Sequence, residues 1–472
     1  MARPHEDCRS EDNREVFKLM ESNVRLDNEL TVPSSIREGN RFLALIPLCL
    51  LGFGSYFCYA NIAVVYAYWT NEHISLANYI NMGSRAVFCF FGGFLIDRVF
   101  GIRRGTIIYT IILLMGQLIV ASGAKLNEIW VMHLGLAIFG IGAESLTVAQ
   151  YKYAVLWFKG KELNMVFGLL MLVARVASSL NRWPPIYEYV DKLCQSNRTV
   201  GIVQLLVTLT CVGSLLCALI LGYMDKRAER ILKRNNNRSG QIPRLTDVFS
   251  FKPPFWMVSI ILVFYDAAIF LFVSKENNFL TGRFNYTSTE AETLVWLAFS
   301  IMTMFPPIFG FIIDKLGRNL IWIFSATATT IVAFLLLFFT ELSPYKTILK
   351  MALFYSVMAS SVLPMVSLII PEHQLGTAYG FCQFVENLGV LFILIILENI
   401  DNYIWFIVIL FGCLTFALIA SCVILVYDKM LRGNLNMTPQ QRINFDNSLN
   451  PAIIQRVERE RNLPLNPIPA LI

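Results

Sequence analysis

Apolar residues gather in long runs along this chain, and short polar stretches separate the runs. About twelve runs are long enough to cross a bilayer, because a membrane helix needs roughly 20 predominantly apolar residues. The pattern therefore predicts an all-α integral membrane protein with twelve transmembrane helices in two six-helix bundles. The runs begin near Phe42, Ala77, Gly105, Glu128, Asn164, Thr199, Pro254, Glu290, Asn319, Thr347, Gly376 and Tyr403.

Basic residues are concentrated in every second connection between the predicted helices. Lysine and arginine collect on the cytosolic side of membrane proteins, so this alternation sets the orientation. Both termini are then expected in the cytosol. The basic connections contain Arg98, Arg103 and Arg104; Lys159 and Lys161; Lys226, Arg227, Arg230, Lys233, Arg234, Arg238 and Arg244; and Lys315 and Arg318.

Sequons for N-glycosylation provide an independent check of this orientation. The sequons at Asn197 and Asn285 fall in connections assigned to the lumen, and we expect glycans there. Those at Asn237 and Asn436 fall on the cytosolic side and should stay unmodified.

The two halves of the chain repeat two local motifs. Gly93-Phe-Leu-Ile-Asp97-Arg98 follows the second predicted helix, and Gly310-Phe-Ile-Ile-Asp314-Lys315 follows the eighth. A weaker repeat relates residues 161–168 to residues 373–380. The repeats predict a two-bundle transporter whose substrate site lies between the halves at the membrane midplane. The expected division is a tail at 1–41, bundles at 42–224 and 254–427, a basic linker at 225–253 and a second tail at 428–472.

The acids of the first motif suggest a gate on the cytosolic side. Asp97 and Asp314 can pair with bases across the cytosolic faces of the helices and latch the lumen-open state. The expected gate residues are Asp97, Arg98, Asp314, Lys315 and Arg318.

Composition excludes several classes of protein. The chain has 472 residues, of which 56% are hydrophobic and 15% charged, whereas soluble domains carry about 25% charged residues. The net charge of +6 is modest and its bases lie between helices, so it reports topology and not nucleic-acid binding. Most of the ten cysteines lie in apolar runs, which argues against a disulfide framework or a metal site. No phosphate-binding loop, metal-ligand cluster or activated nucleophile is present, so neither an enzyme nor a cofactor is expected.

A short segment of the N-terminal tail is similar to an acidic dileucine sorting signal, with Glu15 followed by Leu19 and Met20. A chance match in a charged tail is an equally good interpretation.

Two charged residues at bilayer depth are the strongest functional signal. Glu144 lies near the middle of one apolar run and Arg175 in the next. An unpaired carboxylate at this depth costs about 3 kcal/mol, so it must be paired or hydrated. We interpret Glu144 and Arg175 as the polar centre of a transport cavity. The alternative is a structural ion pair between adjacent helices.

Three further charges are expected near the bilayer centre: Arg85, Asp266 and Glu386. Two bases and three acids suit a zwitterion, because an acid holds an ammonium group and an arginine holds a carboxylate. Polar groups also join membrane helices, which is the alternative for these residues. Tyr59 and Tyr265 are candidate lining residues, although tyrosines in such helices also serve packing.

Several long segments resemble a known family, in order, from about Phe42 to Asn436. Among them are residues 51–59, 91–103, 157–164, 227–232 and 371–381. The chain resembles the lysosomal dipeptide transporters of the major facilitator superfamily. The resemblance implies facilitative export of dipeptides from the lysosomal lumen to the cytosol, with Glu144 at the peptide's amino end and Arg175 at its carboxylate. It also implies a heavily glycosylated single-span accessory subunit.

The chain departs from the family pattern where the cavity is expected. Ala60, Arg85, Lys152, Asp266 and Leu363 stand where the family has other residues. Two alternatives stay open: Asp266 and Glu386 favour a proton-coupled transporter of another organic solute, and the altered pocket favours a transport-inactive scaffold or receptor. The plasma membrane is the alternative location.

Overall fold

The computed structural model describes residues 34–67, 71–160, 162–180, 199–232, 244–398, 403–431 and 433–442. All regular elements in these ranges are helical. The sorting-signal candidate (Glu15, Leu19 and Met20) and the sequons at Asn197 and Asn237 lie outside the described residues.

The first half of the chain forms one helical bundle. Its first crossing is made by two helices, α2 and α3, which meet at Gly52, where the Ser55 hydroxyl donates to the Gly52 carbonyl. The elements are α2 (Ser34–Leu51), α3 (Phe53–Ala67), α4 (Asn71–Leu95), η1 (Ile96–Phe100), α5 (Gly101–Leu126), α6 (Ile129–Phe158), α7 (Leu163–Leu180) and α9 (Thr199–Leu232).

The second half forms the other bundle. Its second crossing is also broken, because α11 and α12 meet at an angle of 41° just before Pro306. Proline favours such a break since it lacks the backbone N–H that a continuous helix requires. The elements are η3 (Leu245–Ser250), α10 (Pro253–Phe284), α11 (Ser288–Met304), α12 (Pro306–Leu316), α13 (Asn319–Phe339), α14 (Pro344–Ile369), η4 (Glu372–Gln374), α15 (Leu375–Glu398) and α16 (Tyr403–Met430).

Among the described residues, nine helices are long and apolar enough to cross a membrane, or ten if the bent pair counts as one crossing. One of the nine, Gly83–Leu126, runs from α4 through η1 into α5. At 1.5 Å per residue its 44 residues would extend for about 66 Å, roughly twice the hydrocarbon thickness. It therefore makes two crossings, with a change of direction at Gly101, whose φ is +68°.

Several helices are longer than their apolar runs. The first helix begins at Ser34 and not near Phe42, and α9 continues to Leu232, beyond the expected linker boundary. The last helix likewise continues to Met430. Hydropathy detects only the part of a helix that lies in hydrocarbon, whereas polar turns can continue the helix into water.

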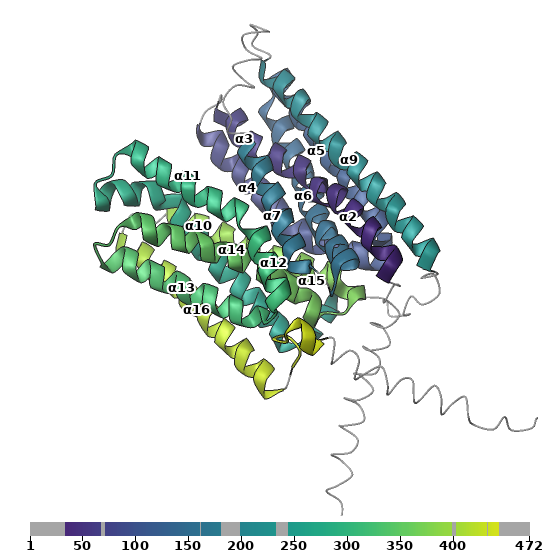
Figure 1. Ribbon diagram of the computed structural model, residues 1–472. Coiled ribbons are helices and arrows are strands. Elements are labelled where there is room, and N and C mark those ends of the chain that lie inside the picture. The colour runs from purple at the N-terminus through teal and green to yellow at the C-terminus, as the bar shows by residue number, and fades with distance from the viewer. Residues whose placement is uncertain are drawn as a thin grey trace, which may run out of the picture.

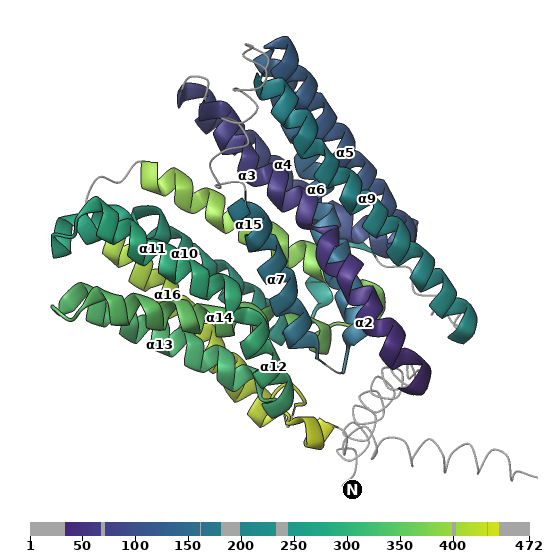
Figure 2. The same cartoon turned by 45° about the horizontal axis from the view of Figure 1, so that its top comes forward.

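The two bundles face each other across an interface formed by few helices. In Figure 1 the purple-to-teal helices form one bundle and the green-to-yellow helices the other. Helix α4 packs on α15, and α7 packs on α12 and α14. The turned view in Figure 2 shows α7 and α15 between the two groups.

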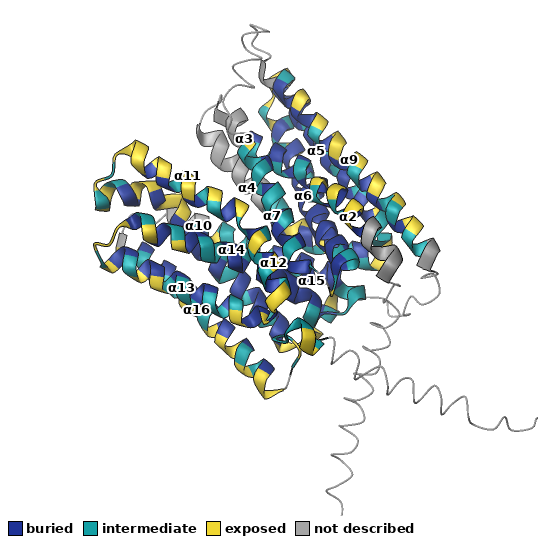
Figure 3. Ribbon diagram, viewed as in Figure 1, coloured by how far each residue is buried: buried dark blue, intermediate teal, exposed yellow. Residues whose placement is uncertain are grey.

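Apolar side chains cover the outside of the molecule. Figure 3 shows exposed positions along the outer faces of α9, α13 and α16, with buried positions inside each bundle. Leu209 on α9 and Phe416 on α16 are 64% and 57% exposed. An apolar outer surface over helices with internally satisfied backbones is the arrangement that a bilayer requires.

Candidate functional site

The five charges predicted at bilayer depth all lie in the middle part of their helices. Glu144 is near the centre of α6, Arg85 is on α4 and Arg175 on α7. Asp266 and Glu386 come from α10 and α15 of the other bundle. The structure thus brings charges of both halves into one region, where Glu386 lies within electrostatic range of Asp266 and Glu144.

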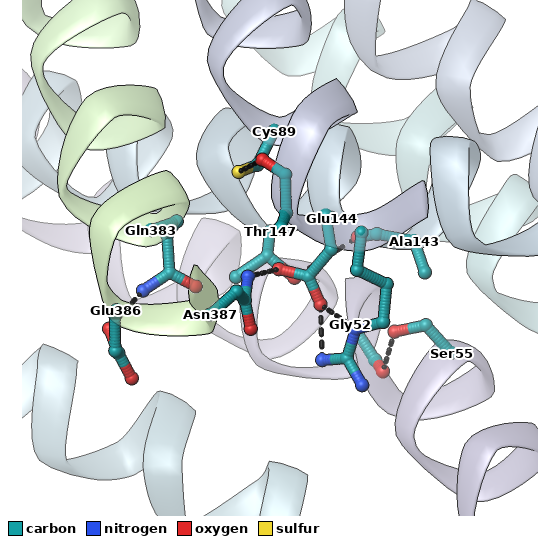
Figure 4. A network of polar contacts seen from close by, with 11 residues as sticks. Gly52, Ser55, Cys89, Ala143, Glu144, Thr147, Gln383, Glu386 and Asn387 are labelled. Carbon is teal, nitrogen blue, oxygen red and sulfur yellow. Dashed lines mark hydrogen bonds and ion pairs between the residues drawn. The ribbon is translucent and has the colours of Figure 1, made fainter. Parts of the chain in front are cut away.

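Glu144 forms its ion pair with Arg85. The Arg85 Nε atom donates to Glu144 Oε1 at 2.6 Å, and Arg85 Nη2 also contacts that oxygen. The second carboxylate oxygen accepts from the amide of Asn387 at 3.5 Å, across the interface between the bundles. Figure 4 shows Asn387 directed at Glu144, which is only 3% exposed.

This pairing corrects the expectation that Arg175 is the partner of Glu144. Helix α4 packs directly on α6, so Arg85 reaches the acid first. The Arg85 guanidinium also lies over the ring of Tyr59, with 4.5 Å between its central carbon and the ring centroid. Tyr59 therefore supports the base of the pair.

Arg175 points instead to the second bundle. Its Nη2 atom donates to the hydroxyl of Tyr355 on α14 at 2.6 Å. Its guanidinium carbon lies 4.9 Å from the Tyr355 ring centroid and 5.7 Å from that of Phe299 on α11. Tyr355 and Phe299 were not predicted, because aromatic residues in apolar helices carry no distinguishing sequence pattern.

The two acids of the second bundle have different surroundings. Glu386 accepts a hydrogen bond from the Gln383 amide at 2.7 Å, one turn earlier on α15 (Figure 4). Asp266 is partly exposed and lies within electrostatic range of Arg175. Among the described residues it forms no hydrogen bond or ion pair within the distances that define one.

Tyr265 does not line this region, contrary to its selection as a lining residue. It is fully buried in the second bundle, and its hydroxyl forms a hydrogen bond with Thr330 at 2.9 Å. Its ring stacks on that of Tyr355 at 6.3 Å. Tyr265 therefore packs against Tyr355 inside the second bundle. Its neighbour Asp266 faces another way, because adjacent residues of a helix point in different directions.

The candidate gate joins the two halves at one end of the molecule, where η1, η4 and the start of α7 lie; we call this the gate end. Asp97 accepts from the backbone N–H of Gly376 at 3.1 Å and of Thr377 at 2.6 Å, and from the Thr377 hydroxyl at 2.8 Å. Lys152 of its own bundle donates to it at 2.5 Å. A carboxylate at the N-terminus of α15 satisfies N–H groups that the helix leaves unpaired.

Asp314 makes the corresponding contacts in the opposite direction. It accepts from the backbone N–H groups of Asn164 at 3.1 Å and Met165 at 2.8 Å, at the start of α7. Asn164 and Met165 occupy the same places in the weaker repeat as Gly376 and Thr377. The aspartate motif of each half (Gly93–Arg98 or Gly310–Lys315) thus contacts the weaker repeat of the other half (residues 373–380 or 161–168).

The bases predicted to pair with these two acids make other contacts. The Arg98 guanidinium lies over Phe94 and the Lys315 ammonium over Phe311, at 5.6 and 4.3 Å from the ring centroids. The backbone N–H of Arg318 donates to the Met437 carbonyl at 3.2 Å. Across the interface both acids bind backbone N–H groups at helix starts, and the base that pairs with Asp97 is Lys152 of its own bundle.

Glycines allow the helices at the gate end to approach closely. A Cβ atom on Gly93 would lie 2.1 Å from the carbonyl oxygen of Gly376. A Cβ atom on Gly310 would lie 2.4 Å from the carbonyl oxygen of Asn164. Both contacts are closer than any side chain permits, so the glycine of each first motif is needed for the contact that its aspartate makes.

The family follows from this two-bundle geometry together with sequence comparison. The model of the Major Facilitator Superfamily matches residues 48–394. The chain belongs to this superfamily. It is 40% identical over 421 residues to the human lysosomal dipeptide transporter MFSD1, covering 86% of this chain and 90% of that protein. The zebrafish (Danio rerio) MFSD1 is 40% identical over 418 residues, covering 85% and 90%. The chain is therefore a member of the MFSD1 family, a multi-pass membrane transporter and not an enzyme.

Solved structures of the superfamily share the fold. The outward conformation of the transporter FucP superposes with a TM-score of 0.66 at 12% identity, covering 82% of this chain and 99% of that one. An outward-facing bacterial homologue of the iron transporter ferroportin has a TM-score of 0.60 at 12% identity, covering 83% and 99%. At these identities the likeness concerns the fold alone.

Proposed function

We propose that this protein exports dipeptides from the lysosomal lumen to the cytosol by facilitated alternating access. The observation that carries the proposal is that Arg175 of the first bundle lies within electrostatic range of Asp266 of the second bundle, while its guanidinium is held by Tyr355. A dipeptide has one ammonium and one carboxylate group, and such a pair of opposite charges complements it. The name of the human relative, 40% identical, supports the same substrate and organelle.

Arg175 is the residue that we assign to the substrate carboxylate. Its guanidinium has five N–H donors in a planar fork that matches a carboxylate. Tyr355 accepts from one of its nitrogens, Nη2, and the rings of Tyr355 and Phe299 fix its plane. This support orders the guanidinium before the substrate arrives, which reduces the entropy lost on binding.

The gate end is the cytosolic end in this proposal. The Asp97 and Asp314 contacts hold the bundles together there, and we assign this arrangement to a carrier open toward the lumen. Export requires these bonds to break while the lumenal ends of the bundles close. No step in this cycle needs a second substrate, and a uniporter is the simplest assignment.

A proton-coupled transporter is the second candidate. It is favoured by one observation, that Glu386 lies within electrostatic range of both Asp266 and Glu144. Acids in such proximity can exchange a proton during the cycle. Dipeptide flux into proteoliposomes that is unchanged by a pH gradient would exclude it.

We also propose a heavily glycosylated single-span accessory subunit as a partner on the lumenal side. Its presence is testable by purifying the tagged transporter from lysosomal membranes under mild detergent. A stoichiometric glycoprotein with one membrane span supports the assignment, and a transporter that purifies alone from intact lysosomes contradicts it.

Thermal stabilisation of the purified transporter tests the substrate class. A ligand that binds only the folded state raises the melting temperature by mass action. We expect dialanine to stabilise the parent, and alanine or glucose to have no effect. Arg175→Ala should abolish the stabilisation, whereas Arg283→Ala, which removes an exposed arginine beside Phe284, should retain it. Stabilisation by sugars and not by dipeptides would overturn the proposal.

A further inference from the structure

The ion pair between Arg85 and Glu144 changes which acid is free to bind substrate. Two nitrogens of Arg85 face one oxygen of Glu144, while Asn387 faces the other. An ammonium group would have to displace a guanidinium that is tethered to the adjacent helix. The Arg85 guanidinium would then compete with the substrate ammonium for the Glu144 carboxylate for as long as the substrate is bound.

The remaining charges give a different set of partners. With Arg85 and Glu144 neutralising each other, Arg175, Asp266 and Glu386 are left at this depth. Glu386 already accepts from Gln383 through one of its oxygens. Asp266 is partly exposed and, among the described residues, has neither a hydrogen bond nor an ion pair within the defining distances.

Tyr355 places Asp266 and Arg175 in the same region. It accepts a hydrogen bond from Arg175, and Asp266 lies within electrostatic range of its hydroxyl. Asp266 also lies within electrostatic range of Arg175. A cation of the first bundle and an anion of the second are therefore arranged around one tyrosine.

We propose that Asp266 receives the substrate ammonium in this protein, with Arg175 at the carboxylate and Arg85–Glu144 as a closed wall of the site. This inference rests on the proposed function. It assigns the ammonium to the second bundle, although the family resemblance implied Glu144 in the first. Because each substrate charge then binds a different bundle, the bound dipeptide draws the two halves together, as closure of the lumenal side requires.

The test compares dialanine with N-acetyl-dialanine, which lacks the ammonium charge. Each peptide is titrated into the detergent-solubilised transporter, and the rise in melting temperature gives its half-saturating concentration. The measured quantity is the ratio of the two half-saturating concentrations. We expect the parent to prefer dialanine at least tenfold. Asp266→Asn should bring the ratio close to one without changing the weak binding of the acetylated peptide.

Two variants separate this assignment from the alternative. The double variant Arg85→Asn with Glu144→Gln removes the closed pair without leaving an unpaired charge, and it should keep the preference for dialanine. Asp266→Glu should also keep it, because the carboxylate is retained. Ligand-free melting temperatures establish that each variant is folded.

The outcomes are distinct. A preference that survives Asp266→Asn but is lost in the double variant would overturn the inference and return the ammonium to Glu144, with the proposed function intact. A preference that survives in both variants would overturn it as well. A parent that binds no dipeptide would overturn the proposed function together with the inference.

Discussion

Asp97 in η1 accepts two hydrogen bonds from Thr377, the third residue of α15, at 2.6 Å from its backbone N–H and 2.8 Å from its hydroxyl. Asp314 accepts from the backbone N–H of Met165, the third residue of α7, at 2.8 Å. The two halves are thus locked by the same contact made twice in opposite directions. A transporter that alternates must break both contacts in each cycle.

Asp97→Asn should shift the transporter toward the state that is open at the gate end. The amide has one acceptor oxygen in place of two and no charge, and hydrogen bonds to charged groups contribute about 1.5–3 kcal/mol each. Spin labels on Arg104→Cys and Leu316→Cys, both exposed at this end, report the separation of the bundles by pulsed electron resonance. Glu290→Gln, which alters a helix cap on α11, is the matched control and should leave the distance distribution unchanged.

Gly93→Ala should destabilise the same contact through shape alone. The added methyl group meets the Gly376 carbonyl oxygen at 2.1 Å, so α4 and α15 must separate. Overpacking of this kind costs about 1–3 kcal/mol, measurable as a lower melting temperature. At Gly213 on α9 a Cβ atom meets nothing within 4 Å, so Gly213→Ala should melt no lower than the parent. Equal melting of the two variants would contradict the close approach of the helices.

Separate and joint removal of Arg85 and Glu144 should be strongly non-additive. Removing one member of a buried ion pair costs about 3–5 kcal/mol, because the other charge is left without a partner. The double variant Arg85→Asn with Glu144→Gln should therefore unfold closer to the parent than either single variant. Melting temperatures of the four proteins give this comparison. Additive losses would show that the pair is not formed in solution.

His373, which lies at the gate end, should make the stability of the protein depend on pH. Burial lowers the pKa of His373 below its ordinary value of 6.5, despite the opposing effect of Asp97. The unfolded chain then binds more protons as the pH falls below 6.5, so the contribution of neutral His373 is present above that pH and lost below it. His373→Asn should give a melting temperature that falls less steeply between pH 7.5 and about 5.5 than that of the parent. An identical slope would show that His373 does not titrate differently on folding.

Glycan mapping tests the orientation of the chain. Asn285 is exposed between α10 and α11, at the end opposite the gate, whereas Asn436 lies beside Met437 and hence near Arg318 at the gate end. We expect Asn285→Gln to lose one glycan, seen as a change in electrophoretic mobility. Asn436→Gln should migrate as the parent does, and a glycan on Asn436 would reverse the assignment of the two sides.

The amino-acid sequence by itself determined the class of fold, because hydropathy is a local property. The runs near Phe42, Glu128 and Pro254 became helices α2, α6 and α10, and the repeated Gly93 and Gly310 motifs revealed the two halves. It also predicted mid-membrane depth for Glu144, Arg175 and Asp266, and all three lie within long helices of the structure.

Tertiary structure alone decided which of these residues meet. The sequence favoured Arg175 as the partner of Glu144, and only the packing of α4 on α6 selects Arg85. The same holds at the gate, where Asp97 meets the N-terminus of α15, some 280 residues away in the chain. Pairings between helices depend on which faces pack together, and that is fixed by the whole bundle and not by any one of its segments.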